Sequence, residues 1–300
     1  MTTAHSTPSA YGVSPSGYRL PSETHLGRVR LQVADVDRSI AYYESIIGFR
    51  VLSRVGSTVM LAPEGDDHVI VELHEKPNAK PVSRRGQIGL YHFAILLPNR
   101  VSLGRFIRHL ATEGEPAGMS DHFVSEAVYL QDPDGLGIEV YADRPRSEWR
   151  AENGQLVMST IPLDVQSLLR EAGGSSWSGM PPGTVLGHVH LHVGDLAQGA
   201  AFYHEALGLD KVVWHYPGAL FMSAGGYHHH LGTNTWGVGS TVASENDARL
   251  IEWEVIVPSA GDVDRTAASL EGKGFAVERE SGDVVARDPW GTQVRVKASA

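Results

Sequence analysis

A few polar side chains in an otherwise apolar stretch are the first sign of chemistry in this sequence. The run "DHFVSEAVYLQDPDGLGIEVY" at 121–141 places His122 and Tyr129 ahead of an Asp-Pro-Asp-Gly turn, and Glu139 inside the apolar segment "GIEVY". A carboxylate among strand-forming apolar residues is costly to desolvate unless another group pairs with it. A bound metal is one such partner, and the question that follows is why a histidine and a tyrosine lie just upstream.

Composition narrows the choice of metal and partner. The 300 residues include 15 histidines and no cysteine, so a metal site must use imidazole and carboxylate ligands, which suit iron, manganese, zinc or nickel. The net charge of -10 argues against nucleic-acid and anionic-membrane partners. No apolar run could cross a membrane, and the polar N-terminus lacks the apolar core of a signal peptide, so we expect a cytoplasmic protein.

The chain repeats itself at a constant offset of 160 positions. Residues 26–51 align with 186–211, and residues 90–98 align with 250–258. Self-similarity at a fixed period indicates duplicated structural units. We therefore divide the chain into a flexible or loosely docked N-terminal arm (1–24), a first half (25–142), a connector with one short helix, "DVQSLLREA" (143–184), and a second half (185–300).

Each half divides again into two similar modules. The segments "VRLQV" and "VHLHV" alternate apolar and polar residues as half-buried strands do, and an aspartate suited to an N-cap and an apolar helical pattern follow them. The order strand–helix–strand–strand–strand recurs four times, at roughly 26–76, 89–142, 185–236 and 249–297. The predicted fold class is therefore α+β, with four such βαβββ modules.

Four such modules with these motifs resemble the vicinal oxygen chelate superfamily, which includes glyoxalase I, the extradiol ring-cleaving dioxygenases and the bleomycin-resistance proteins. The resemblance covers nearly all of residues 25–297. It implies that modules pair into two half-open mixed-sheet barrels, with metal ligands on the first and last strands of a module. Those positions hold, in chain order, Arg28, Glu72, His92, Glu139, His188, a residue of "YHHHLGTNTW", Glu252 and Arg295.

Only modules two and three carry ligand-type residues throughout, because arginine has no free lone pair for a metal. The resemblance therefore implies a site of His92, Glu139 and His188, which leaves coordination positions open for other ligands. One barrel must hold all three residues. Module two should therefore pair with module three, and module one with module four.

The second barrel would then collect the four remaining charged positions. Two arginines and two glutamates sum to zero charge, and we expect charge-assisted hydrogen bonds between them in place of a metal. The residues are Arg28, Glu72, Glu252 and Arg295.

The segment ending at Glu139 also resembles the sequence pattern of the extradiol dioxygenases. His122, Val128, Tyr129, Asp132, Pro133, Gly135 and Glu139 fill that pattern in order, with Ser120 at a position where the pattern prefers glycine. The resemblance implies iron(II) as the cofactor, with manganese(II) as the alternative, and a small aromatic diol and O2 as substrates. It also implies that His122 and Tyr129 donate hydrogen bonds to charge that develops during the reaction.

A further acid–base histidine is implied within "YHHHLG". We assign it to His229, although alternation along a strand would place His228 and His230 together on the opposite face. Trp236, just beyond this run, is a candidate for the floor of a ring-binding pocket.

Two other functions fit the same modules. A glyoxalase-type isomerase or lyase would use zinc, nickel or manganese and could take His230 as a fourth ligand, but its chemistry does not need His122 and Tyr129. A metal-free small-molecule binding protein requires degenerate ligand positions in every module, and modules two and three are not degenerate. The sequence leaves open the ring substituents, the position of cleavage and the oligomeric state, although exposed barrel edges would suit a homo-oligomer.

Overall fold

The computed structural model describes residues 11–83 and 86–299, and the four modules follow the predicted order. The first half contains β1 (His25–Val33), α1 (Val36–Tyr42) with its π-helical continuation η1 (Tyr43–Ile47), β2 (Arg50–Val55), β3 (Thr58–Ala62), β4 (Val71–Glu75), β5 (Gly89–Leu96), α2 (Arg100–Glu113), β6 (Gly118–Asp121), β7 (Ser125–Gln131) and β8 (Gly137–Asp143). The second half contains β11 (Val185–His192), α4 (Leu196–Ala200) with its π-helical continuation η3 (Ala201–Ala206), β12 (Asp210–Val213), β13 (Ala219–Ser223), β14 (Leu231–Asn234), β15 (Arg249–Val257), α5 (Ala260–Gly272), β16 (Val277–Glu280), β17 (Asp283–Arg287) and β18 (Gln293–Ala298).

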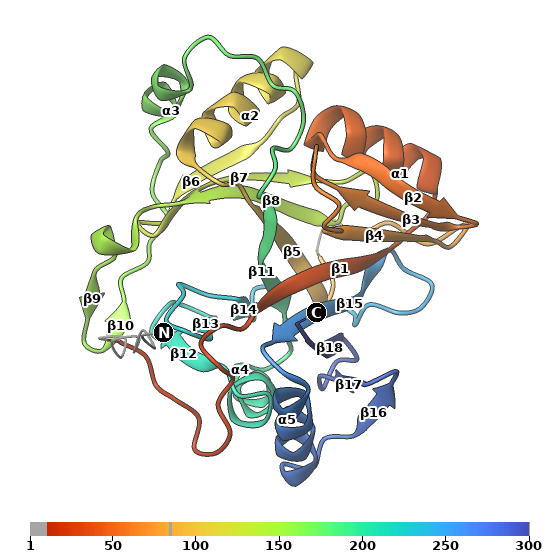
Figure 1. Cartoon of the computed structure of the whole chain (residues 1–300), viewed down its shortest axis with the longest axis vertical. Coiled ribbons are helices and arrows are strands. Elements are labelled where there is room, and N and C mark those ends of the chain that lie inside the picture. The colour runs from red at the N-terminus through yellow and green to blue at the C-terminus, as the bar shows by residue number, and fades with distance from the viewer. Residues whose placement is uncertain (1–10, 84–85, 300) are drawn as a thin grey trace.

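The modules pair across the two halves of the chain. Within the described residues, one eight-stranded mixed sheet has the order β12-β13-β14-β11-β5-β8-β7-β6, and a second has the order β16-β17-β18-β15-β1-β4-β3-β2. The antiparallel pairs β5–β11 and β1–β15 join the modules at the centre of each sheet. The predicted α+β class is confirmed, as is the pairing of module two with module three and of module one with module four (Figure 1).

The module helices begin at residues whose side chains satisfy free backbone N–H groups. The side chains of Asp35, Asn99, Asp195 and Ser259 each accept a hydrogen bond from the backbone N–H three residues on. The apolar faces of these helices then pack on their sheets, with Tyr43 and Phe106 fully buried. Helix burial against the outer faces leaves the inner faces of the sheets free to present polar side chains.

A buried tyrosine holds the turn before the last strand in each half. The Tyr43 hydroxyl lies 3.3 Å from Asp132 Oδ2, and the equivalent Tyr203 hydroxyl lies 2.9 Å from Asp288 Oδ2. Asp132 Oδ1 also accepts hydrogen bonds from the backbone N–H groups of Asp134 and Leu136, both at 2.9 Å. These contacts fix the start of β8, the strand that carries Glu139.

The connector contains the predicted short helix and three further elements that the sequence did not predict. The predicted helix is α3 (Val165–Ala172), which lies beside α2 in Figure 1. Ahead of it come η2 (Arg146–Glu148) and a ribbon of β9 (Ala151–Glu152) and β10 (Gln155–Leu156). Asp121 and Ile161 then exchange backbone hydrogen bonds of 2.9 and 3.0 Å, which hold residues 158–161 against the edge strand β6.

The N-terminal arm is docked where the structure describes it. Backbone N–H groups of Val13 and Leu20 donate to the carbonyls of Lys211 and Gly208 at 2.8 Å, and Leu20 is buried in the main core. The sequence predicted a flexible or loosely docked arm at 1–24, and within residues 11–24 these contacts dock it. Residues 1–10 lie outside the described residues.

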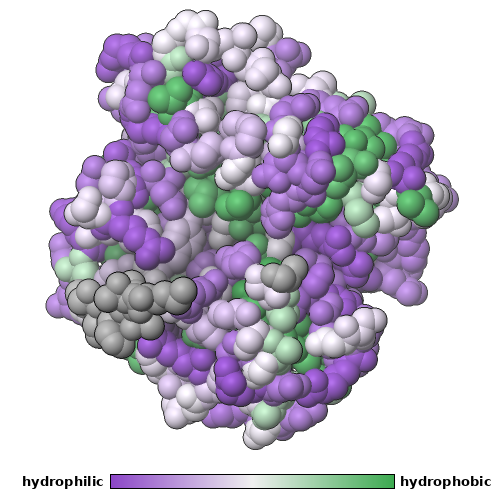
Figure 2. Space-filling model, in the orientation of Figure 1, coloured by the Kyte–Doolittle hydropathy of each residue, from purple (hydrophilic) through white to green (hydrophobic). Residues whose placement is uncertain are grey.

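The surface in Figure 2 is largely hydrophilic, with hydrophobic atoms in separate patches, one near the centre of the view and another at its upper right. Across residues 11–83 and 86–299, the structure contains no helix with the length and apolar character of a membrane span.

Candidate metal centre and catalytic cavity

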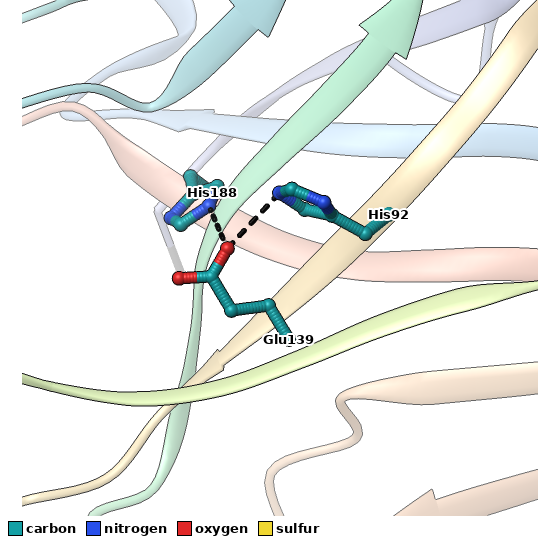
Figure 3. A group of neighbouring side chains, drawn as sticks. All are labelled: His92, Glu139 and His188. Carbon is teal, nitrogen blue, oxygen red and sulfur yellow. Dashed lines mark hydrogen bonds and ion pairs between the residues drawn. The ribbon is translucent and has the colours of Figure 1, made fainter. Parts of the chain in front are cut away.

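Three residues from three strands of the sheet shared by modules two and three converge on one point. His92 Nε2 lies 3.0 Å, and His188 Nε2 lies 3.2 Å, from the same oxygen of Glu139, Oε2 (Figure 3). The potential ligand atoms of the three residues all lie within 4.8 Å of one another, and all three residues are buried. This is the group of His92, Glu139 and His188 that the repeat predicted.

The strand register explains the convergence. Ala94 on β5 is the partner of His188 on β11 and of Glu139 on β8, so these three residues lie level across the sheet. His92 precedes Ala94 by two residues and therefore points to the same face. Ala94 contributes only a methyl group between the three larger side chains, which leaves room for an ion. Sequence reasoning missed this position because an alanine gives no chemical signal.

The electrostatics of the group suit a cation. Burial lowers the pKa of His188 to about 4, so its imidazole is neutral near pH 7 and can present a lone pair. Burial alone would raise the pKa of Glu139, but its contacts with His188 and His92 hold it well below the usual value. Ligand atoms about 2.1 Å from a first-row metal lie roughly 3–4 Å from one another, and the distances of 3.0 and 3.2 Å from Glu139 Oε2 to the two histidines are in this range. The residues therefore fit a first-row metal.

His122 and Tyr129 form a hydrogen-bonded pair beside this group. His122 Nε2 lies 2.6 Å from the Tyr129 hydroxyl, and His122 Nδ1 lies 2.7 Å from the carbonyl oxygen of Ser159. A carbonyl can only accept, so Nδ1–H donates to Ser159 and Nε2 accepts from the Tyr129 hydroxyl. Burial, and next the charge of Glu139, raises the pKa of the Tyr129 hydroxyl well above 10, so the hydroxyl keeps its proton.

The three consecutive histidines separate into three environments. The prediction that they form a strand is wrong, because β14 begins only at Leu231 and residues 224–230 form a loop. The His229 ring lies over the His188 ring, with ring centroids 4.0 Å apart, and faces the cavity. His230 lines a different cavity with His25 and Arg146, and its Nδ1 accepts from the backbone N–H of Ala224 at 3.2 Å.

His228 connects His229 to a carboxylate. His228 Nε2 lies 2.9 Å from Asp143 Oδ1, and His228 Nδ1 lies 2.7 Å from His229 Nδ1. The carboxylate accepts from an N–H at His228 Nε2, which leaves His228 Nδ1 as the acceptor and His229 Nδ1 as the donor between the two rings. His229 Nε2 is then the nitrogen with the lone pair. Burial, with smaller effects of the neighbouring histidines, holds the pKa of His229 well below 6.5, which keeps this ring neutral.

The three candidate ligands, the His122–Tyr129 pair and His229 line one cavity of about 220 Å³, whereas His228, His230 and Asp143 do not. Aromatic side chains and three connector residues complete its walls. The full set in the described chain is Tyr91, His92, Ser120, His122, Ser125, Tyr129, Glu139, Met158, Ser159, Thr160, His188, His190, Tyr216, Phe221, His229 and Trp236. Trp236 is 49 % exposed, so it lies at the mouth of the cavity rather than at the floor.

The equivalent positions in the other barrel carry a network of ion pairs. Arg28 Nε lies 3.0 Å from Glu72 Oε2, and Arg295 Nε lies 2.8 Å from Glu252 Oε1. The predicted Arg–carboxylate contacts are therefore confirmed. Arg30 extends the network, because it lies 3.1 Å from Glu72 and 3.0 Å from Glu252.

Glu254, like Arg30, is a member of this network that sequence reasoning missed. It is the repeat equivalent of Ala94, 160 positions on, and lies 3.2 Å from Arg28. A charged side chain thus stands where the other barrel has a methyl group. The repeat could have shown that Glu254 lies at the centre of the second barrel, because Glu254 aligns with Ala94 at the same offset of 160 positions that aligns Glu252 with His92.

Comparisons with known proteins agree with this architecture. The family model for the Glyoxalase/Bleomycin resistance protein/Dioxygenase superfamily matches residues 25–140 and 185–296. A catechol-2,3-dioxygenase of Bacillus subtilis (strain 168) is 42% identical over 271 residues, which cover 89% of this chain and 94% of that protein.

Solved structures show the same fold at low identity. A Bacillus subtilis protein provisionally described as a dioxygenase superposes with a TM-score of 0.64 at 12% identity, covering 94% of this chain and 86% of that one. Glyoxalase I from Zea mays superposes with a TM-score of 0.51 at 18% identity, covering 91% of this chain and 92% of that one.

Proposed function

This chain belongs to the Glyoxalase/Bleomycin resistance protein/Dioxygenase superfamily, and we propose that it is an extradiol dioxygenase that opens the ring of catechol or a substituted catechol with O2. The observation that carries the proposal is the meeting of two groups in one cavity. His92, Glu139 and His188 suit a metal, and the His122–Tyr129 pair and His229 line the same space. The 42% identity to a catechol-2,3-dioxygenase supports the substrate class.

We assign His92, Glu139 and His188 as the residues that hold iron(II), with manganese(II) as the alternative. The bound metal would act as a Lewis acid toward the catechol hydroxyls and bring the catechol and O2 together. The aromatic walls of the cavity then have to hold the ring and limit the access of water. Tyr91, Phe221 and Trp236 supply such surfaces.

His229 is the group placed to move a proton from the substrate. Its Nε2 carries the lone pair because Nδ1–H donates to His228, and its ring lies against His188. A catechol bound beside His188 could therefore lose a hydroxyl proton to His229 Nε2. The same imidazolium could return that proton later in the reaction, as general acid–base histidines do.

Tyr129 is the group placed to donate to developing negative charge, because its hydroxyl carries a proton that can turn toward the substrate. The resemblance also implied His122 as a donor, but with Nδ1–H bonded to Ser159 its Nε2 accepts, so His122 orients the Tyr129 hydroxyl. The Tyr129 hydroxyl remains protonated. It contacts the His122 ring, and the Ser159 carbonyl holds that ring in place. Fixed donors in a buried cavity stabilise charge without reorganisation. In the overall reaction both atoms of O2 enter one product, a ring carbon–carbon bond beside the diol breaks, and catechol is the reductant, so no further cofactor is consumed.

The glyoxalase-type alternative loses the residue that favoured it. His230, its candidate fourth ligand, lines a different cavity and bonds to the backbone of Ala224. His122 and Tyr129 also have no part in that chemistry.

The test is anaerobic reconstitution of the metal-free protein with iron(II), followed by catechol and then O2. We expect oxygen uptake equal to the catechol consumed and a yellow ring-opened product. A parallel sample with manganese(II) distinguishes the two metals, and the hemithioacetal of methylglyoxal and glutathione tests the glyoxalase alternative. Turnover of the hemithioacetal without oxygen uptake from catechol would overturn the proposal.

A further inference from the structure

The part of the cavity wall that the structure describes offers no lysine or arginine side chain to a substrate. Among the described residues that line it, none is a lysine or an arginine, and Glu139 is the one carboxylate. The nearby arginines of the connector already have partners. Arg144 pairs with Asp121 at 2.6 Å and Glu126 at 3.1 Å, and Arg146 lies over the Trp149 ring at 5.4 Å from its centroid.

The described residues at the mouth of the cavity are aromatic or hydroxyl-bearing and carry no formal charge. The Trp236 ring lies 5.7 Å from the Tyr91 ring and 6.4 Å from the Tyr216 ring, measured between centroids. The Tyr216 hydroxyl is 3.0 Å from Thr160 Oγ1, which joins module three to the connector across the mouth. A ring substituent that points outward would therefore meet aromatic faces and hydroxyl groups.

The volume sets a size limit. A closed apolar cavity of about 150 Å³ is known to hold benzene. The present cavity, at about 220 Å³, therefore has room for a dihydroxylated ring and a few further atoms before a substituent enters the mouth. The space fits a single ring with a compact substituent.

From the charge, the aromatic mouth and the volume together, we propose that the substrates are catechols whose ring substituent is compact and uncharged, and that catechols with a carboxylate substituent are disfavoured. This inference rests on the proposed function, because it concerns the same cavity. The physical reason is desolvation: a substituent carboxylate would leave water without gaining a cation, and an uncompensated charge in a buried site is costly.

The test compares two substrates that differ only in charge. In 3,4-dihydroxyphenylacetate and 3,4-dihydroxyphenylacetamide the methylene group insulates the diol from the substituent, and the carboxylate and amide have nearly the same size. For the iron-loaded enzyme we expect kcat/KM to be higher for the amide by roughly 10–100-fold. Complete burial of an unpaired carboxylate would give a larger ratio, but the mouth of the cavity is open to water. The dissociation constants of the two compounds, from anaerobic calorimetric titration, should differ in the same direction.

A matched pair of variants tests the cause. Thr160→Lys places a cation at the mouth, and Thr160→Gln adds a neutral chain in the same place. The acid-to-amide ratio within each variant removes any general loss of activity, and we expect that ratio to rise in Thr160→Lys and to stay low in Thr160→Gln.

Two failures are distinguishable. Good turnover of catechol with equal constants for acid and amide in the unmodified enzyme would overturn this inference alone. No turnover of catechol at all would overturn the proposed function and the inference with it.

Discussion

His228 Nε2 donates to Asp143 Oδ1 at 2.9 Å, and through this bond a carboxylate outside the cavity fixes the proton of a histidine inside it. We expect Asp143→Asn to lower kcat by roughly 10–100-fold, by analogy with partners that orient metal-bound histidines. The asparagine side chain loses the charge that holds the N–H at His228 Nε2, so His229 no longer keeps its lone pair at Nε2. KM should change little, because Asp143 does not line the cavity.

The matched control for Asp143→Asn is Glu148→Gln, which neutralises an exposed carboxylate in the same connector. Both variants should bind iron(II) as the unmodified protein does. An unchanged kcat in Asp143→Asn, with equal iron content, would show that the orientation of His229 does not depend on this carboxylate.

His122 and Tyr129 should be needed for turnover and not for metal binding. We expect His122→Ala and Tyr129→Phe to lower kcat by something like 10²–10⁴-fold, the range for a positioned acid–base group, with iron content unchanged. Tyr216→Phe removes a hydroxyl from the mouth of the same cavity and should have a much smaller effect. Full turnover in both His122→Ala and Tyr129→Phe would remove the main chemical argument for a dioxygenase.

The repeat made much of this architecture predictable. Because each module uses the same strand order, the offset of 160 positions is enough to locate the equivalent first-strand positions. Arginine at position 28 cannot bind a metal, whereas histidine at position 188 can. This difference indicates that module three, and not module one, shares the metal site with module two, and it therefore predicts how the modules pair. The ligands lie on regular strands, where local sequence pattern is informative.

The rest depends on contacts between segments distant in sequence. The Ser159 carbonyl that fixes His122 comes from a connector that has no repeat equivalent, so no internal alignment could reveal it. The alternation argument failed for the histidine run because Gly225 and Gly226 both have left-handed backbones, with φ of 61° and 66°, and end the strand pattern there. The partner of His228 is Asp143, 85 residues away.

Ala94 should be essential for the metal because it is small. We expect Ala94→Leu to weaken iron(II) binding by roughly 10–100-fold, since the larger side chain would displace His188 or Glu139 from the common point. Overpacking also costs stability, typically about 1–3 kcal/mol. The control is therefore Ala142→Leu, at a buried alanine in the main hydrophobic core on β8. Metal content after equilibrium dialysis should fall in the first variant only; equal retention in both would show that the space at Ala94 is not used.

The ion-pair network of the second barrel should stabilise the fold in a pH-dependent way. Glu72 is 2% exposed and contacts Arg28, Arg30 and His74. Removing one member strands charged partners, so Glu72→Gln should lower the free energy of unfolding at pH 7 by about 3–5 kcal/mol. An exposed control, Glu44→Gln, should change it by less than about 0.5 kcal/mol.

The pH dependence of that loss follows from the pKa of Glu72. Burial alone would raise this pKa, but the hydrogen bond with His74 and the charges of Arg28 and Arg30 lower it to about 2 from an ordinary value of 4.5. A carboxyl with a depressed pKa in the folded state stabilises the protein above pH 4.5, and this stabilisation disappears as the pH falls toward 2. Denaturant titrations at several pH values should therefore show the difference between the unmodified protein and Glu72→Gln constant above about pH 5 and shrinking below it. A difference that stays constant down to about pH 2 would mean that the loss in Glu72→Gln comes from packing and not from the carboxylate charge.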